Sequence, residues 1–362
     1  MATSAAGTPH ADAISPDEAL AEVAAGAGAR DHADPRFPDD AMTTLERAGL
    51  LAATVPLDAP APSHAEEWAL LRRIARADGS VGRIADGHFN AVERVAALAP
   101  EPLRTHELRA VAAGARRMGV WGADPTPAEG NPARLVGRTG EQSLAGVKVF
   151  CSGAGGIDRA LVTVHGASLQ PVLVLVDVTA GTTVDPTWFR GSGMRTSESH
   201  RVEFDGAPVL AVLGEPGEIV REPWFSRDAI RTAACWAGIA DRAADAVLEA
   251  LAARPAVGDL DALAAGRVIG AQATIDGWLE VAGRAAADPA RDLRTMSVNL
   301  RAAVAAACRE IVGAGSVAAG SRALSGSGDL DRCRRDLELF LMQHRLEPMV
   351  ARVGRAELER RR

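Results

Sequence analysis

The sequence predicts an α+β protein in which a helical part, a β part and a second helical part follow one another. Apolar residues keep helical spacing in the first third, short β-branched runs fill the middle, and long Ala-rich amphipathic segments follow. We therefore expect an N-terminal all-α domain over 1–117, an antiparallel β domain over 118–222 and a C-terminal four-helix bundle over 223–362.

Helix-start signals divide the first part. Ser15-Pro16-Asp17-Glu18 predicts a helix start, because Pro suits the first turn and acidic groups favour the positive end of the helix dipole. A second helix is expected from Phe37-Pro38-Asp39-Asp40 to Gly49. After a Pro/Ala loop at 57–63, Glu66–Arg76 resumes helical spacing. The first dozen residues are expected to be disordered.

The middle part contains four short runs with strand character. Gly, Asp and Pro turns bound them, and their spacing leaves no room for intervening helices. An antiparallel sheet is therefore favoured over a doubly wound Rossmann unit. The predicted strands are Val147–Cys151, Leu161–Val164, Val172–Val178 and Val202–Phe204.

The last part contains four Ala-rich amphipathic segments, whose small side chains permit close helix packing. Breaks are expected near Pro255-Ala256-Val257-Gly258, Asp288-Pro289 and Ser325-Gly326-Ser327-Gly328. The segments span 225–252, 259–287, 291–319 and 329–353.

Composition excludes several chemistries. The 362-residue chain has no Tyr and a single lysine, Lys148, beside 39 arginines. A Tyr–Lys acid pair is therefore impossible, and a Schiff-base enzyme would depend on Lys148. The net charge of -7 and the absence of a basic stripe argue against nucleic acid as a partner. The eight histidines form no metal-binding pattern, so no metal is expected.

The same composition bears on the compartment. Four widely spaced cysteines fit a reduced thiol set better than a disulfide framework. The N-terminus lacks a signal-peptide pattern, and the longest purely apolar runs are far below a membrane span. We expect a soluble cytoplasmic protein without a membrane partner.

Several motifs, taken in order, resemble the acyl-CoA dehydrogenase superfamily of FAD-dependent enzymes over roughly residues 35–350. The resemblance implies the three-domain order given above. It is carried by Phe37-Pro38-Asp39-Asp40 with the turn ending at Val55-Pro56, by 74–82 (IARADGSVG), by 146–154 (GVKVFCSGA), by Gly193-Met194-Arg195-Thr196 with Val202-Glu203-Phe204-Asp205, and by Arg335-Asp336.

The resemblance also implies a flavin site between the β domain and the bundle. Trp121, Gly122 and Ala123 match a flavin-contacting strand end. Phe150 matches the aromatic residue beside the flavin, and Ser152 the hydroxyl near its N5 edge. Without the resemblance, Phe150 is equally well an ordinary core residue and Ser152 a turn residue. A planar wall with a few aimed hydrogen bonds is what a flavin requires.

The sequence departs from the family at the catalytic base. The glutamate that follows the Arg-Asp pair is replaced by His344, and the matching position in the family's second subgroup is Asp228. Either could act as a general base if it faced the substrate α-carbon. The structural alternatives are a buried histidine bonded to a carbonyl, and for Asp228 an ordinary acid in a first helical turn.

The cofactor-binding positions depart as well. The Arg-x-x-Phe-Gly segment reads Arg254-Pro255-Ala256-Val257-Gly258, the Gln before Gly-Gly reads Glu310-Ile311-Val312-Gly313-Ala314, and Ala123 replaces a flavin-contacting Thr. Arg254 and Gly313 remain as the matching cofactor residues. The expected cofactor is FAD, bound weakly, or a reduced flavin taken up as a co-substrate.

One stretch points to a different branch of the superfamily. Residues 78–88, which end in His88, resemble the flavin-dependent monooxygenases, which take reduced flavin from a partner reductase and use oxygen. His88 and His344 would then stabilise the oxygen adduct. The alternative is that His88 packs beside Phe89 where the domains meet.

The resemblance therefore supports three hypotheses. The leading one is α,β-dehydrogenation of an acyl thioester with hydride transfer to FAD, an electron-transfer flavoprotein or oxygen being the acceptor. The second is reduced-flavin monooxygenation of another small-molecule substrate. The third is a degenerate, non-catalytic member. A homodimer or tetramer formed through the bundle is expected, with the flavin site completed across the interface.

Overall fold

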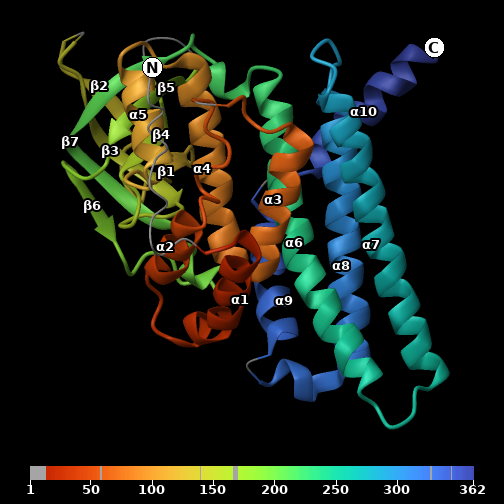
Figure 1. Cartoon of the computed structure of the whole chain (residues 1–362). Coiled ribbons are helices and arrows are strands. Elements are labelled where there is room, and N and C mark those ends of the chain that lie inside the picture. The colour runs from red at the N-terminus through yellow and green to blue at the C-terminus, as the bar shows by residue number, and fades with distance from the viewer. Residues whose placement is uncertain (1–13, 58, 139, 166–169, 327, 344) are drawn as a thin grey trace, which may run out of the picture.

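A computed structural model describes residues 14–362 except 58, 139, 166–169, 327 and 344. The prediction of disorder for the first dozen residues, and the position of His344, lie outside this part of the chain. The strands lie at one side of the molecule, the long C-terminal helices at the other, and the N-terminal helices between them (Figure 1). The molecule thus mixes helices with a sheet, as the sequence predicts.

The N-terminal helices begin at the predicted signals. Ser15 and Ser63 each cap a helix, and in both cases the third residue of the helix, Glu18 or Glu66, bonds back to the serine. The segment 74–82 is two helices, because Asp78 has an extended backbone and its side chain accepts the N–H groups of Ser80 and Val81. The helices are α1 (Pro16–His32), α2 (Asp39–Arg47), α3 (His64–Ala77), α4 (Gly79–Leu98) and α5 (Leu103–Ala112).

The strands form one seven-stranded sheet with the order β1-β4-β5-β7-β3-β2, and β6 pairs with β7. Every pair is antiparallel except β1 with β4, so the predicted antiparallel arrangement is confirmed for most of the sheet. The strands are β1 (Met118–Trp121), β2 (Arg134–Val136), β3 (Ser143–Cys151), β4 (Arg159–Val164), β5 (Val172–Asp177), β6 (Thr182–Asp185) and β7 (His200–Leu213).

The C-terminal helices follow the predicted segments with one correction. The last segment is not one helix over 329–353. One helix ends at Phe340, and another begins at Glu347 with Pro348 in its first turn, where proline is tolerated. Gly320 interrupts the helical backbone of the third segment close to its predicted end. The helices are α6 (Trp224–Ala252), α7 (Asp259–Ala286), α8 (Arg294–Leu324), α9 (Asp329–Phe340) and α10 (Glu347–Arg360).

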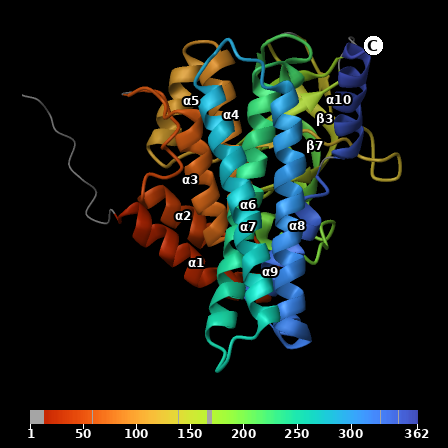
Figure 2. The same cartoon turned by 90° about the vertical axis from the view of Figure 1, so that its right-hand side faces the viewer.

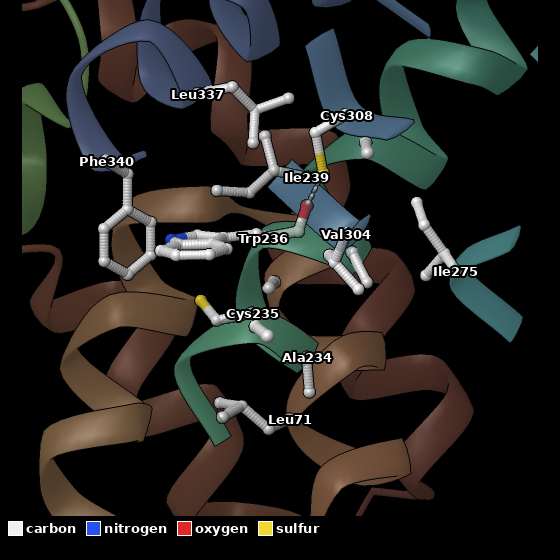
Figure 3. Packing of buried hydrophobic residues seen from close by; sticks show 14 of the residues in the cluster. Leu71, Ala234, Cys235, Trp236, Ile239, Ile275, Val304, Cys308, Leu337 and Phe340 are labelled. Carbon is white, nitrogen blue, oxygen red and sulfur yellow. Dashed lines mark hydrogen bonds between the residues drawn. The ribbon is translucent and has the colours of Figure 1, made fainter. Parts of the chain in front are cut away.

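One hydrophobic core joins the N-terminal helices to the C-terminal ones. The rings of Trp236 and Phe340 meet edge to face at its centre (Figure 3). Small residues let α6 approach α3 closely: a Cβ on Gly238 would lie 2.1 Å from the carbonyl oxygen of Arg72. Because this core is shared, the division at 117 and 222 remains a prediction.

Helix α8 is long and apolar enough to cross a membrane by length and composition alone. In the structure it packs against α6, α7 and α9. Packing buries 39% of its most apolar stretch, and residues such as Val317 stay exposed.

Candidate functional site

The end of β1 meets the end of β3 through a bridge between Ala123 and Val149, although the two strands are far apart in the strand order. The indole Nε1 of Trp121 donates to the carbonyl oxygen of Ser152 at 2.9 Å, and the N–H of Val149 donates to the carbonyl oxygen of Ala123 at 3.1 Å. Trp121 is buried, whereas Gly122 and Ala123 are exposed. The exposed backbone after β1 is thus tied to the end of β3.

Phe150 has an unusual conformation for a strand residue. Its φ of 52° lies in the left-handed region, and its side chain is 55% exposed. It sits where the pairing of β3 with β7 shifts, and its ring meets the edge of Trp188 at a centroid distance of 4.8 Å. A bulky residue in this region is strained, and such strain concentrates at functional sites. Phe150 therefore presents an aromatic surface outward instead of packing in the core.

Three serine hydroxyls continue from Phe150 toward the interior. Ser152 Oγ lies 2.9 Å from Ser199 Oγ, which lies 2.8 Å from Ser197 Oγ. Ser197 and Ser199 are buried and Ser152 is partly buried. This hydroxyl row can donate directed hydrogen bonds to a polar ring edge placed against Phe150.

The segment that carries Ser197 is fixed by α9. Asp336 Oδ1 accepts the N–H of Met194 at 2.5 Å, and a Cβ on Gly193 would lie 2.0 Å from the carbonyl oxygen of Arg335. Met194 and Glu198 both have left-handed backbones. Burial raises the pKa of Asp336 to about 7. A carboxyl group in this range can exchange a proton near neutral pH.

The buried side chain of Lys148 supports the exposed end of β1. Its ammonium is buried and donates to Asp124 Oδ1 at 2.7 Å, to Thr163 Oγ1 at 3.1 Å and to the carbonyl oxygen of Gly122 at 3.3 Å. Burial lowers the pKa of Lys148, and Asp124 opposes this effect. With these three partners Lys148 holds the strand end in place, and no Schiff-base role is indicated.

His88 is committed to backbone groups on both sides. The N–H of Met118 donates to Nδ1 at 3.1 Å, so Nε2 carries the hydrogen and donates to the carbonyl oxygen of Leu51 at 3.1 Å. The side chain is buried, and burial lowers the pKa of His88 to about 4. The ring is neutral at physiological pH and joins α4 to β1 and to the loop after α2.

Asp228 lies in a buried ion-pair network at the start of α6. Its carboxylate bonds Arg94 at 2.5 Å and Arg231 at 2.6 Å, and Arg231 also bonds Glu67 and Glu93. Burial raises the pKa of Asp228, and the two arginines act against that rise. Both carboxylate oxygens are occupied, so Asp228 faces arginines and not an open site.

Arg254 and Gly313 lie away from these strand ends. Arg254 follows α6, donates to the carbonyl oxygen of Ala318 at 2.6 Å and pairs with Asp261. The turn between α6 and α7 is at the far end of the long helices from the strands in both views (Figures 1 and 2). Within one chain, the structure brings together Trp121, Gly122, Ala123, Phe150 and Ser152, but neither Arg254 nor Gly313.

Some residues of the site were not identified from the sequence. Ser197 and Ser199 come directly after the Gly193–Thr196 motif, so that motif was the available signal. Lys148 was noted as the only lysine, and Asp336 as part of a motif, but neither was given a role at the site. Trp188 carries no motif, and only the tertiary structure places it against Phe150.

Comparison with known proteins identifies the fold. No protein-family model and no curated protein sequence matches the chain. Solved structures do match it over almost its whole length, and they have the acyl-CoA dehydrogenase-like fold.

Three of these structures illustrate the likeness. A complex of TdsC from Paenibacillus sp. A11-2 with FMN and indole has a TM-score of 0.82 at 19% identity, covering 95% of this chain and 96% of that one. Methanesulfinate monooxygenase MsuC from Pseudomonas fluorescens has a TM-score of 0.77 at 18% identity, covering 96% and 97%. Nitrososynthase from Micromonospora carbonacea var. africana has a TM-score of 0.78 at 22% identity, covering 95% and 97%.

Proposed function

We propose that this protein is a flavin-dependent monooxygenase that uses reduced flavin and oxygen to oxygenate a small organic substrate. The observation that carries the proposal is the pairing of Phe150, strained and exposed, with the serine row that begins at Ser152. Together they offer a flat aromatic wall and directed hydroxyl groups, which suit a flavin ring. The likeness to TdsC, solved with FMN, and to MsuC supports this choice.

Each group at these strand ends has a task in the proposal. Phe150 and Trp188 would cover one face of the ring, and the backbone of Gly122 and Ala123 would meet its rim. Ser152 would donate to a ring nitrogen, with Ser199 and Ser197 fixing the direction of its hydroxyl. Reduced flavin, when bound, supplies the two electrons that let one oxygen atom of O₂ enter the substrate while the other leaves as water.

Monooxygenation is preferred to acyl thioester dehydrogenation because of Asp228. Dehydrogenation requires a free base against the substrate α-carbon. Asp228 is bonded to Arg94 and Arg231 on both carboxylate oxygens. His344, the other proposed base, lies outside the described residues. Monooxygenation needs no such carboxylate.

Spectroscopy and turnover test the proposal in two steps. The purified protein is titrated with FMN and with FAD, and a perturbed flavin spectrum is expected for at least one of them. Supplied reduced FMN, oxygen and indole should then give an oxygenated indole in an oxygen-dependent reaction. Anaerobic bleaching of bound flavin by butyryl-CoA would instead support the dehydrogenase. Failure to perturb either flavin spectrum, together with no oxygenated product from reduced FMN, would contradict both hypotheses.

Variants locate the flavin. Phe150→Ala and Ser152→Ala should each weaken flavin binding about tenfold or more, because each removes one element of the wall. Val220→Ala serves as the control for Phe150→Ala, since Val220 is similarly exposed at 57%. Ser325→Ala is the control for Ser152→Ala. Equal affinities for all four variants would show that the flavin binds elsewhere.

A further inference from the structure

A second group of buried charges lies on the other side of α4 from the sheet. Ile84 and His88 of α4 face the strands, through Gly153 and Met118, whereas Asp86 bonds Thr232 of α6. Around Asp86 lie two arginines, each over an aromatic ring. We call Arg83, Asp86, Trp236, Arg301 and Phe340 the arginine–aromatic cluster.

Among the described residues, Asp86 is the carboxylate whose charge favours that of Arg301 of α8, but no hydrogen bond joins the two. Arg301 is only 2% exposed, and its Nε and Nη2 have no hydrogen-bond acceptor among the described residues. Its guanidinium lies 4.7 Å from the centre of the Trp236 ring. Burial lowers the pKa of Arg301 to about 10, so it is still charged at neutral pH.

The one carboxylate of the cluster is bonded to other groups through its Oδ2 atom. Asp86 accepts from Arg83 at 2.6 Å and from the hydroxyl of Thr232 at 3.3 Å. Arg83 itself lies over Phe340 with its guanidinium 5.7 Å from the ring centre. Two positive charges and one negative charge leave the cluster one anion short. A buried charge without a partner is costly, so its retention calls for an explanation.

The arginine–aromatic cluster contains a third hydrogen-bond donor. The indole Nε1 of Trp236 is also buried without an acceptor among the described residues. The Trp236 ring stands edge to face with Phe340 at 6.1 Å and an angle of 89° (Figure 3). Three N–H groups on adjacent side chains therefore lack an acceptor. An anion is the kind of group that would supply the missing acceptors.

The cluster is close to the candidate site along α9. Asp336 contacts the segment that carries Ser197, and Phe340 follows it by four residues. Four residues of helix span about 6 Å. Arg83, the partly exposed member, gives the cluster its contact with solvent.

We propose that Arg301 and Trp236 bind the negatively charged group of an organic substrate, a carboxylate or an oxyanion of similar shape. The identification of the ligand as substrate rests on the proposed function. The anion site itself does not, because it is built from protein groups on the bundle side of α4.

Binding without flavin tests the site. The flavin-free protein is titrated calorimetrically with potassium benzoate and with benzamide, its neutral analogue. We expect saturable benzoate binding and at least tenfold weaker benzamide binding. Arg301→Met should lower benzoate affinity at least tenfold and leave benzamide unchanged. Trp236→Phe, which keeps the ring but loses the donor, should lower benzoate affinity several-fold and provides the test if Arg301→Met does not fold.

Stability separates recognition from a structural role. Arg301→Met should melt no lower than the wild type, because no hydrogen bond joins the lost charge to a carboxylate among the described residues. Arg267→Met, at an exposed arginine of α7, is the control and should leave benzoate binding unchanged. The proposal is overturned if the wild type does not bind benzoate, or if chloride at equal ionic strength competes as strongly as benzoate. It is also overturned if Arg301→Met melts lower while its benzoate affinity is unchanged.

The outcome is independent of the flavin test. Benzoate binding by a protein that perturbs no flavin spectrum would keep the anion site and refute the monooxygenase. Oxygenation activity without benzoate binding would do the reverse.

Discussion

Lys148 is the single lysine of a sequence whose other basic side chains of this type are all arginines. The chain has 39 arginines, yet a lysine occupies this buried position between β1, β3 and β4. Its three oxygen partners lie between 2.7 and 3.3 Å from one nitrogen. A compact ammonium with three donors fits such a site, whereas a planar guanidinium with a longer reach does not.

Replacing Lys148 should therefore be costly even with arginine. Lys148→Met removes the ammonium from three oxygen atoms, but Asp124 is partly exposed and keeps its bond to His165, so we expect the free energy of unfolding in urea to fall by about 1–2 kcal/mol. The free energy of unfolding of Lys148→Arg should be lower by a similar amount, because the larger guanidinium must displace its neighbours. Asp124→Asn is the matched control for the ion pair. If Lys148→Arg is as stable as the wild type, the size argument is wrong.

His88 gives a second prediction at this scale, and its sign follows from the pKa. The folded-state pKa of about 4 is below the unfolded value of 6.5, so the unfolded chain binds more protons between these pH values. His88 contributes roughly 3 kcal/mol to the free energy of unfolding. This contribution is fully present above pH 6.5 and is lost as the pH falls toward 4.

The variant His88→Asn isolates this effect. It keeps an acceptor for Met118 but loses the donor to Leu51, so at pH 7 it should be less stable by about 1–3 kcal/mol. The difference from the wild type should shrink between pH 6.5 and 4 in urea unfolding. His165→Asn, at an exposed histidine, is the control and should show no such convergence. A constant difference would contradict the assignment.

At the scale of the element, α4 and α9 organise both proposed sites. One side of α4 meets the sheet through His88, and the other meets α6 through Asp86. Helix α9 fixes the segment before β7 through Asp336 and contributes Phe340 to the arginine–aromatic cluster. A shift of either helix would therefore disturb flavin wall and anion site together.

Asp336 should make the docking of α9 depend on pH in the opposite sense to His88. Its folded-state pKa of about 7 exceeds the ordinary 3.8, so the folded protein binds more protons between these values. The free energy of unfolding has its full value below pH 3.8. It falls by up to roughly 4 kcal/mol as the pH rises through 7. Asp336→Asn keeps an acceptor for the Met194 N–H and removes the titration.

The measurement is urea unfolding of both proteins between pH 5 and 8. Asp336→Asn should be more stable than the wild type throughout this range, and its advantage should grow as the pH rises from 5 to 8. Glu338→Gln, on the exposed side of α9, serves as the control. An Asp336→Asn protein that is less stable at pH 8 would show that the charged form is the one the fold requires.

At the scale of the whole molecule, the outer face of α7 and α8 is uncovered by the rest of the chain (Figure 2). Leu260, Leu263 and Ile269 of α7 and Val317 of α8 are exposed on these helices. Gly266 and Gly270 lie on α7 with open space around them. Large exposed apolar side chains are found at interfaces between subunits when they form a patch. These exposed residues fit the expected dimer or tetramer formed through the bundle.

A charge on this face should separate the subunits. The double variant Leu263→Glu with Ile269→Glu is expected to run as a monomer in light scattering where the wild type does not. Because Arg254 and Gly313 lie far from the strands of their own chain, the monomer should also bind flavin more weakly if they complete a partner's site. Val212→Glu, on β7, is the control. A wild-type monomer would refute the expected assembly.

The sequence by itself determined the succession of elements and the flavin-wall candidates. Capping residues such as Ser15 and Ser63 fix helix starts locally, and the motif around Phe150 and Ser152 placed both residues at one strand end. These features depend on neighbours along the chain, so local patterns reveal them. The motif at 74–82 was less informative, because a motif does not show that Asp78 divides it into two helices.

Only the tertiary structure decided which polar groups are free to act. His88 and Asp228 matched functional positions, yet Leu51, Met118 and Arg94, which bond them, come from other elements, and Arg231 of the same helix bonds Asp228 as well. Conversely, Arg301 carries no motif, and only the packing of the helices shows that its Nε and Nη2 have no acceptor in the described part of the chain. Hydrogen bonding and burial are set by contacts distant in sequence, so the residue type alone could not give their chemical state.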